Sequence, residues 1–282
     1  MYIFNRIEIT NIDINKFNKI KNKSIFTTIE WINFIHEDSE AKPIILEIFQ
    51  KDVFVGYFSA LTVNKFGIKI VASPFAGWST CFMGFDVNLN NKTDILSDLI
   101  KYLFKKFKCH YIEIIDRDIS VDQAKSAGFN CSPVCTLELD INRSDQELFK
   151  AFKTDCRNFI RQFERRGAIL EEAIPNDEFA EEYYEQLKDV FAKQFMVPTY
   201  SLQKVKKLLK HLSKTDRLLC LRIKNPAGKS IATSIFLGYK EKFFFWGGAS
   251  LRSYQNYRPN EYMIWYAIKY WRNRGCKVFD MV

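Results

Sequence analysis

The chain has no long apolar run, and its N-terminus lacks the features of a secretory leader. A membrane-spanning helix needs about 20 consecutive apolar residues, and no stretch of this sequence approaches that length. The N-terminal segment (MYIFNRIEITNIDIN) has no basic region followed by an apolar core and small residues. We therefore expect a cytoplasmic protein without an integral membrane segment, and peripheral contact with a membrane stays open.

Histidine is scarce, and cysteine follows no metal-binding pattern. The chain has three histidines and seven widely spread cysteines, with no C-x-x-C pair. No metal site is expected, and the cysteines are predicted to be reduced core residues. No histidine stands in a partnered motif and no serine in a nucleophile elbow, which argues against mechanisms based on either residue.

Aromatic residues and positive charge are plentiful. The 282 residues are 47% hydrophobic and 16% aromatic, enough to bury the cores of two domains. The net charge is +9, but residues 1–142 hold 16 basic and 17 acidic residues, whereas residues 143–282 hold 26 and 16. This asymmetry indicates that the second half meets a polyanion, with a solvated basic surface as the alternative.

The last forty residues predict a strand–helix–strand unit. Residues 242–250 (KFFFWGGAS) and 276–282 are expected to be parallel strands, joined by a helix over residues 259–274. Pro259 suits the first helical turn, and Gly275 follows the last. In such a unit, ligands bind in the loop after the first strand. The candidate binding residues here are Trp246, Gly247, Gly248, Ser250, Arg258 and Asn260.

The element order occurs twice. The first half predicts strands at 43–50, 53–63 and 68–72, a loop at 73–85, a helix at 93–106 and a strand at 111–115. The second predicts helices at 144–167, 176–194 and 201–212, strands at 218–224 and 230–238, and then the terminal unit. We expect an α/β fold with mixed sheets in two lobes, residues 1–140 and 141–282.

Helices, a three-stranded meander and a strand–helix–strand crossover resemble the GNAT acyltransferase fold, and two units in tandem resemble the FemAB family. The resemblance rests on DINRSDQELFKAFKTDCRNFIRQFERRGAILEE, with its Arg-Asn-x-Ile-Arg-x-x-x-Arg-x-Gly pattern, and on WGGAS followed by YRPNEYMIWYAIKYWRNRGCKVFDM. It implies a bacterial N-acyltransferase of two GNAT-like lobes that acts on a peptidoglycan or other cell-envelope precursor.

Two departures from the GNAT pattern concern the acyl donor and the number of strands in the second lobe. The segment SYQNYRPNEY has no glycine where acetyl-CoA enzymes carry a pyrophosphate-binding loop. The resemblance therefore favours an aminoacyl-tRNA donor over acyl-CoA, with no bound cofactor. Relatives continue for further strands after the position of Asp280, so we expect the second lobe to lack its last hairpin or the chain to be a fragment.

A basic stripe runs along the predicted helix at 144–167. Arg157 and Arg161 lie in a series of basic residues four apart, which puts them on one face beside an apolar one. Such a ribbon binds phosphates, and the family likeness favours this function for the two arginines. The alternative is a solvated helix surface.

Three residues are candidates for the chemistry. Acyl transfer to an amine needs a stabilised oxyanion and benefits from a general base. Glu261 and Asp280 are the candidate carboxylates, and Tyr254 is the candidate acid. The alternatives are a carboxylate favoured by the helix dipole at Glu261 and a structural one at Asp280.

The substrate is expected in a cleft between the lobes. One wall would be the loop at 73–85 with Phe75, Gly77 and Trp78, and the other the loop at 247–260. Two other functions stay open: an acyl-CoA-dependent N-acyltransferase acting on a nucleotide sugar or small amine, and a non-catalytic GNAT-like module that binds polyanions. The sequence does not indicate the oligomeric state.

Overall fold

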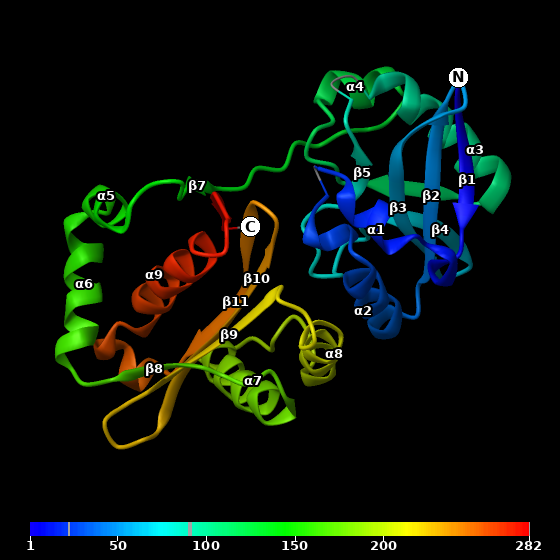
Figure 1. Ribbon diagram of the computed structural model, residues 1–282. Helices are drawn as coiled ribbons and strands as arrows, with labels where there is room; N and C mark the ends of the chain where they lie inside the picture. Colours follow the sequence, from blue (N-terminus) through cyan, green and yellow to red (C-terminus); the bar gives the residue numbers. More distant parts are fainter. Residues whose placement is uncertain (22, 90–91, 282) are drawn as a thin grey trace. The chain divides into compact units, whose positions relative to one another are not determined.

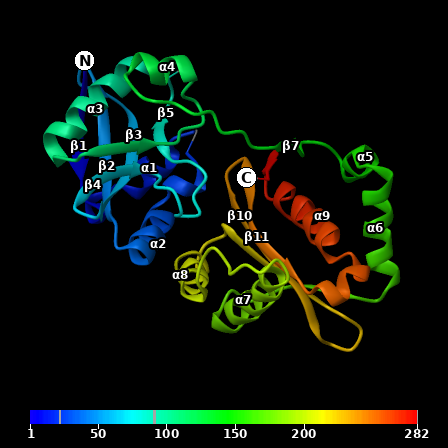
Figure 2. The same cartoon turned by 180° about the vertical axis from the view of Figure 1, so that it is seen from behind.

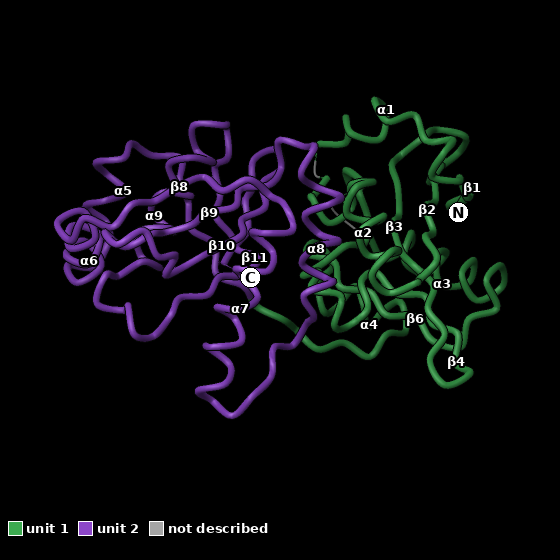
Figure 3. The backbone as a smooth tube through the Cα atoms, turned by 90° about the horizontal axis from the view of Figure 1, so that it is seen from below, with its two compact units in different colours: residues 1–135 green, residues 136–282 purple. Residues whose placement is uncertain are grey.

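The computed structural model describes residues 1–21, 23–89 and 92–281. The chain divides into two compact units, Met1–Cys135 and Thr136–Val282, shown in two colours in Figure 3. The division falls at 135/136 and not at 140/141, because residues 138–140 form a strand of the second sheet. Each unit is described by itself below.

The first unit is built on one mixed sheet (Figure 1). Its strands are β1 (Tyr2–Ile7), β2 (Lys42–Gln50), β3 (Val53–Lys65), β4 (Ile68–Ser73), β5 (Gly84–Val87) and β6 (Tyr111–Ile114). They follow the order β1-β2-β3-β4-β6, with β5 added to β3. β4 and β6 are parallel and are connected through α3 (Thr93–Phe107), so the predicted meander and crossover are confirmed.

Short helices complete the first unit: α1 (Ile14–Lys19), α2 (Ile29–Ser39) and α4 (Val121–Ser126), with 3-10 turns at Ile9–Asn11 and Ile25–Thr27. Thr28 caps α2 by accepting a hydrogen bond from the Trp31 N–H. The apolar face of α3 packs on the sheet through Ile95, Leu99 and Leu103. The first core therefore lies between α3 and β1–β6.

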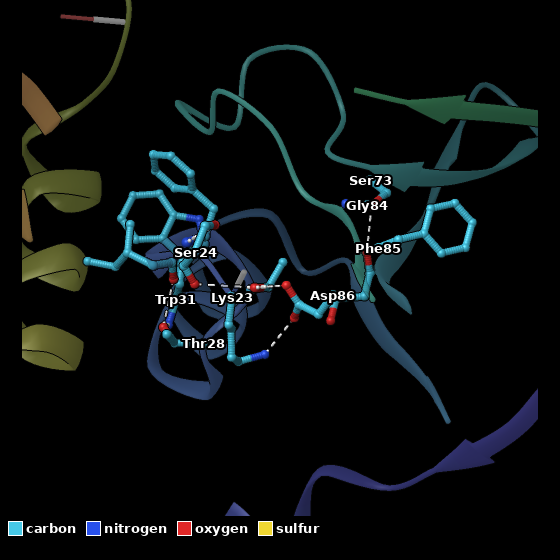
Figure 4. Close-up of polar contacts among 12 residues, drawn as sticks. Lys23, Ser24, Thr28, Trp31, Ser73, Gly84, Phe85 and Asp86 are labelled. Carbon is cyan, nitrogen blue, oxygen red and sulfur yellow. Dashed lines mark hydrogen bonds and ion pairs between the residues drawn. The ribbon is translucent and has the colours of Figure 1, made fainter. Parts of the chain in front are cut away.

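The predicted loop at 73–85 is wrong at its end, because Gly84 begins β5. This strand lies in a buried polar network (Figure 4). The Lys23 Nζ lies 2.7 Å from the Asp86 Oδ2, and the two side chains are 0% and 4% exposed. Burial raises the pKa of the Asp86 carboxyl, and the ion pair with Lys23 opposes that shift. The paired charges fix β5 to the segment before α2, a long-range contact that local sequence patterns do not reveal.

The second unit has a mixed sheet in the order β7-β12-β11-β10-β9-β8. The strands are β7 (Glu138–Asp140), β8 (Ile169–Glu172), β9 (Leu218–Lys224), β10 (Ser230–Tyr239), β11 (Lys242–Ser250) and β12 (Val278–Asp280). β11 and β12 are parallel, and α9 (Pro259–Arg272) connects them after a 3-10 segment at Arg252–Tyr257. The predicted terminal crossover is confirmed, except that Val282 lies outside the described residues.

Helices cover both faces of the second sheet. α6 (Thr154–Arg165) and α9 lie on one face, and α7 (Asp177–Ala192) and α8 (Leu202–Leu212) lie on the other (Figure 1, Figure 2). Phe243 stacks on Phe279 at 4.4 Å between ring centroids and on Trp271 at 6.2 Å, which ties β11, β12 and α9 together. In the described parts of both units, no helix combines the length and apolarity that a bilayer crossing requires.

The single helix predicted over residues 144–167 is wrong. The structure has α5 (Asp145–Ala151), an extended Phe152 with ψ 148°, and then α6. Phe149 and Phe152 both pack on Trp265, with ring centroids 5.6 Å and 5.5 Å away. The bend lets both rings reach α9, so tertiary packing overrides the continuous helical pattern.

Candidate functional site

The candidate site lies in the middle of β11 (Lys242–Ser250), where the strand carries a β-bulge. Ile235 pairs with Gly247 and the next residue, Phe236, pairs with Phe245, so Trp246 is an extra residue. A bulge bends and twists its strand and often reorients side chains at functional sites. Here it directs Trp246 and Gly247 toward residues from α7 and the segment before α8.

Gly247 allows two tyrosine hydroxyls to approach the strand. A Cβ at this position would lie 2.4 Å from the Tyr183 hydroxyl and 3.1 Å from that of Tyr200. The first distance is too short for any side chain, so the approach requires glycine. Tyr183 comes from α7, and Tyr200 immediately precedes Ser201, the N-cap of α8.

The two tyrosines form a hydroxyl pair. Their oxygens are 2.5 Å apart, and either can donate. Tyr183 is 0% exposed. Burial raises the pKa of Tyr183 well above its usual value and also raises the pKa of Tyr200. Both groups are therefore protonated at neutral pH and can act as hydrogen-bond donors.

Trp246 adds a third donor beside this pair. Its ring lies 5.1 Å from that of Tyr200 and 6.3 Å from that of Tyr183. Its Nε1 atom is buried and has no hydrogen-bond partner among the described residues. An unpaired buried donor costs about 1–3 kcal/mol, which an acceptor atom placed there would offset.

A pocket of about 620 Å³ opens next to Tyr200. It lies between α7 and the segment that connects α7 to α8. Its lining is Tyr184, Lys188, Ala192, Met196, Val197, Pro198, Thr199, Tyr200 and Ser201. Aromatic and apolar side chains predominate, with one ammonium group from Lys188. Tyr200 therefore belongs both to the hydroxyl pair and to the lining of a cavity large enough for part of a substrate.

The N-terminus of α9 carries several of the residues predicted from sequence. Arg258 has a left-handed backbone with φ 56°, and its guanidinium lies 3.9 Å from the Phe159 ring centroid. Asn260 is exposed, and Glu261 is half-buried in the first turn. Burial, and secondarily the Glu261 charge, raise the pKa of the Cys156 thiol. The N-terminus of α9, which carries these candidate residues, therefore packs against α6.

The two candidate carboxylates are not brought together. Asp280 is 2% exposed and accepts a hydrogen bond of 2.5 Å from the Thr136 hydroxyl. Asp280 pairs with Phe244 of β11. Phe244 lies three positions before Gly247, which is roughly 10 Å along the strand at about 3.3 Å per residue. This environment favours a structural role for Asp280, while Glu261 lies at the other end of the crossover.

Tyr254 and Ser250 lie on either side of Leu251. Ser250 is 6% exposed and pairs with Ala232. Tyr254 is half-buried in the 3-10 segment, with the Lys229 Nζ 5.2 Å from its ring centroid. Gly248 faces away from the tyrosines, since its Cβ would meet the Phe245 ring at 3.0 Å.

The basic stripe divides into two kinds of contact. The Arg157 Nη1 donates to the Lys150 carbonyl at 2.9 Å and to the Phe152 carbonyl at 2.5 Å, closing the end of α5. Arg161 is exposed, and its guanidinium lies 5.3 Å from the Phe149 ring centroid. Arg157 thus has a structural task in addition to any contact with phosphate.

Phe75, Gly77 and Trp78 belong to the first unit. The Trp78 N–H donates to the Phe75 carbonyl at 3.3 Å, and Gly77 has φ +89°. The two rings are 5.8 Å apart, and Trp78 is 5% exposed. These residues form a tight turn after β4.

Sequence reasoning missed Tyr183, Tyr200 and the pocket beside them. The two glycines stand out because they follow directly after an aromatic run that ends at Trp246. Tyr183 sits in an aromatic stretch of a helix that looks like ordinary core. Its contact with Gly247 links residues far apart in the chain, and no local pattern predicts it.

Comparisons with known proteins agree with this architecture. Residues 150–282 match the family model described as acetyltransferase (GNAT) domain. A curated relative, lipid II:glycine glycyltransferase of Staphylococcus haemolyticus (strain JCSC1435), is 23% identical, with 75% of this chain and 70% of that protein covered.

Solved structures share the fold across the chain. The crystal structure of FemX superposes with a TM-score of 0.76 at 16% identity, covering 98% of this chain and 88% of that one. A tandem GNAT protein from the clavulanic acid biosynthesis pathway gives 0.57 at 9% identity, covering 100% and 89%. Together with the two sheets and their parallel crossovers, these matches show that the chain has the fold of two tandem GNAT-type lobes, the second of which matches the acetyltransferase (GNAT) domain model.

Proposed function

We propose that the protein transfers an aminoacyl group from an aminoacyl-tRNA to an amine of a peptidoglycan precursor. The observation that carries this proposal is the bulge of β11, where the Tyr183–Tyr200 hydroxyl pair approaches Gly247 beside the buried Trp246 N–H, and where Tyr200 also lines a pocket. Donors aimed at one point stabilise the oxyanion that forms when an amine attacks an acyl carbonyl. The relative that acts as a lipid II:glycine glycyltransferase supports the choice of acceptor.

The backbone of β11 offers room for an extended acyl carrier. β12 pairs only with Lys242, Phe243 and Phe244. Among the described residues no strand pairs with residues 245–250 on that side. Backbone N–H and C=O groups on this side of residues 245–250 can bind the terminal nucleotide or the aminoacyl group of a charged tRNA while its carbonyl reaches the donors.

The segment between β11 and α9 supports a donor other than coenzyme A. It is a 3-10 turn without glycine, Arg252–Tyr257, and not an open glycine loop. The Arg166 guanidinium donates to the Asn256 carbonyl, and Tyr262 stacks on Phe163 at 3.9 Å between centroids. Contacts from α6 and its C-cap thus hold this segment and the start of α9, which supports a donor that needs no open pyrophosphate-binding loop.

The test is a competition between donors. The protein is incubated with glycyl-tRNA, with a mixed pool of other charged tRNAs, or with acetyl-CoA, each in the presence of either lipid II in detergent or a nucleotide-linked amino sugar. Mass spectrometry of the acceptor gives the result. A gain of one aminoacyl residue is expected with a charged tRNA, and no gain with acetyl-CoA.

Other outcomes would contradict the proposal in different ways. Transfer from acetyl-CoA alone would replace the donor and favour the acyl-CoA-dependent alternative. Transfer to a nucleotide-linked sugar but not to lipid II would replace the acceptor. No transfer from any donor to either acceptor would reject the catalytic proposal.

A further inference from the structure

We propose that the Tyr200 hydroxyl donates a hydrogen bond to the carbonyl oxygen of the transferred acyl group, and that Tyr183 is the positioning residue that orients it. The inference rests on the proposed function, since it assigns a catalytic role within that site. It concerns two residues that local sequence patterns do not distinguish from core tyrosines.

The direction of the shared hydrogen bond follows from burial. Two hydroxyls that share one hydrogen bond retain one further O–H proton between them. If Tyr200 donated to Tyr183, the remaining proton would belong to a side chain that is 0% exposed, at a cost of about 1–3 kcal/mol. Donation by Tyr183 avoids that cost and leaves the remaining proton on Tyr200, the half-buried member of the pair.

The location fits a carbonyl group. Tyr200 lines the pocket, and its hydroxyl would lie 3.1 Å from a Cβ at Gly247, so it reaches the backbone at the bulge. The buried Trp246 N–H, without a partner among the described residues, lies in the ring that packs on Tyr200. Two donors therefore adjoin the bulge of β11, at which acyl transfer is proposed.

The raised pKa values keep both phenols protonated during the reaction. The acceptor amine forms a bond to the acyl carbon, and the carbonyl π electrons move to the oxygen, which Tyr200 stabilises. The ester C–O bond to the carrier then breaks, and the proton lost by the amine ends on the carrier hydroxyl. Tyr200 keeps its own proton throughout, so its contribution is electrostatic.

The experiment compares Y200F, Y183F and the double variant with wild type, using glycyl-tRNA and lipid II. Y200F is expected to lower kcat by about 100-fold with little change in KM, because only the transition state carries the oxyanion charge. Y183F should lower kcat by roughly 10-fold. The double variant should be no slower than Y200F, because residues that act through one another are not additive.

The control is Tyr270→Phe, which removes a phenol hydroxyl near the C-terminus of α9 and should leave kcat unchanged. Thermal melting and circular dichroism of each variant report folding separately. A kcat within twofold of wild type for Y200F would overturn the assignment of Tyr200. Additive losses in the double variant would overturn the positioning role of Tyr183.

A second measurement separates this inference from the proposed function. Calorimetric titration with adenosine bearing glycine through a 3′ amide reports binding of an acyl carbonyl without turnover. If wild type transfers nothing but binds this probe, and Y200F weakens binding at least fivefold, the carbonyl site stands although the proposed function fails. Equal binding by wild type and Y200F, or none by either, would overturn the site.

Discussion

At the scale of single residues, Gly247 is a position in the candidate site at which the geometry requires glycine. The sequence identifies Gly247 and Gly248 as candidate binding residues, but it does not show why glycine is needed at position 247. The reason is the approach of two hydroxyls contributed by α7 and by the segment before α8. Local patterns therefore identify the glycine, whereas the tyrosines that require it depend on the fold of the whole unit.

Gly247→Ala should destabilise the protein by about 1–3 kcal/mol, because the new methyl displaces the Tyr183 hydroxyl. Combining it with Tyr183→Phe should restore part of that loss, since the nearest atom is then absent. Urea unfolding of both single variants and the double variant measures the coupling. Strictly additive losses would show that the methyl group is accommodated in some other way.

The buried ion pair between Lys23 and Asp86 makes a second residue-scale prediction. Asp86→Asn should cost about 3–5 kcal/mol, because it leaves the Lys23 ammonium buried without a countercharge. Glu47→Gln is the matched control. Its partner Lys16 lies 2.8 Å away, but the side chains are 40% and 21% exposed, so the loss should stay below about 1 kcal/mol. Similar losses for both variants would contradict the role of burial.

At the scale of elements, strands bounded by turn residues were predictable, whereas the short strands β5, β7 and β8 were not. β2, β3, β4 and β9 to β11 alternate or run apolar between clear turns, and they occur where expected. β5, β7 and β8 have three or four residues each and become strands only because a neighbour offers an edge. The break at Phe152 likewise reflects the contact of its ring with Trp265 and no helix-stop residue.

The junction of α5 and α6 gives a test of the basic stripe. Arg157→Ala should lower the free energy of unfolding by about 1 kcal/mol, because the carbonyls at the end of α5 lose their donor. Arg161→Ala, which makes no such bond, should stay within about 0.5 kcal/mol. Chemical denaturation measures both. Should the two arginines also bind phosphates, each variant would reduce the salt dependence of tRNA binding.

At the scale of the whole molecule, the chain consists of two units with separate cores. Both the duplication and the change in charge near residue 140 are visible in the sequence. The sequence does not predict the position of the junction between the two units, because Glu138–Asp140 has the composition of a polar connector. It becomes β7 through antiparallel pairing with β12.

A pair of truncated proteins tests where the second unit begins. We propose that residues 136–282 fold alone with cooperative thermal unfolding, because their core cluster is internal to the unit. A protein of residues 141–282 lacks β7 and exposes the edge of β12, so it should melt at a lower temperature or aggregate. Equal stability of the two would place the functional boundary at 140/141.

The extra residue in β11 also has a consequence for how such a site can change over time. Side chains in a strand alternate between faces with a period of two, and Trp246 resets that phase. Phe245 and Gly248, three positions apart, meet on one face, while Gly247 meets the tyrosines on the other. Deleting Trp246 would make Phe245 and Gly247 direct neighbours, so residues 247–250 would keep both their faces and their partners in β10. Loss of this one residue would therefore remove the bulge and the buried indole N–H, while the rest of the strand keeps its register.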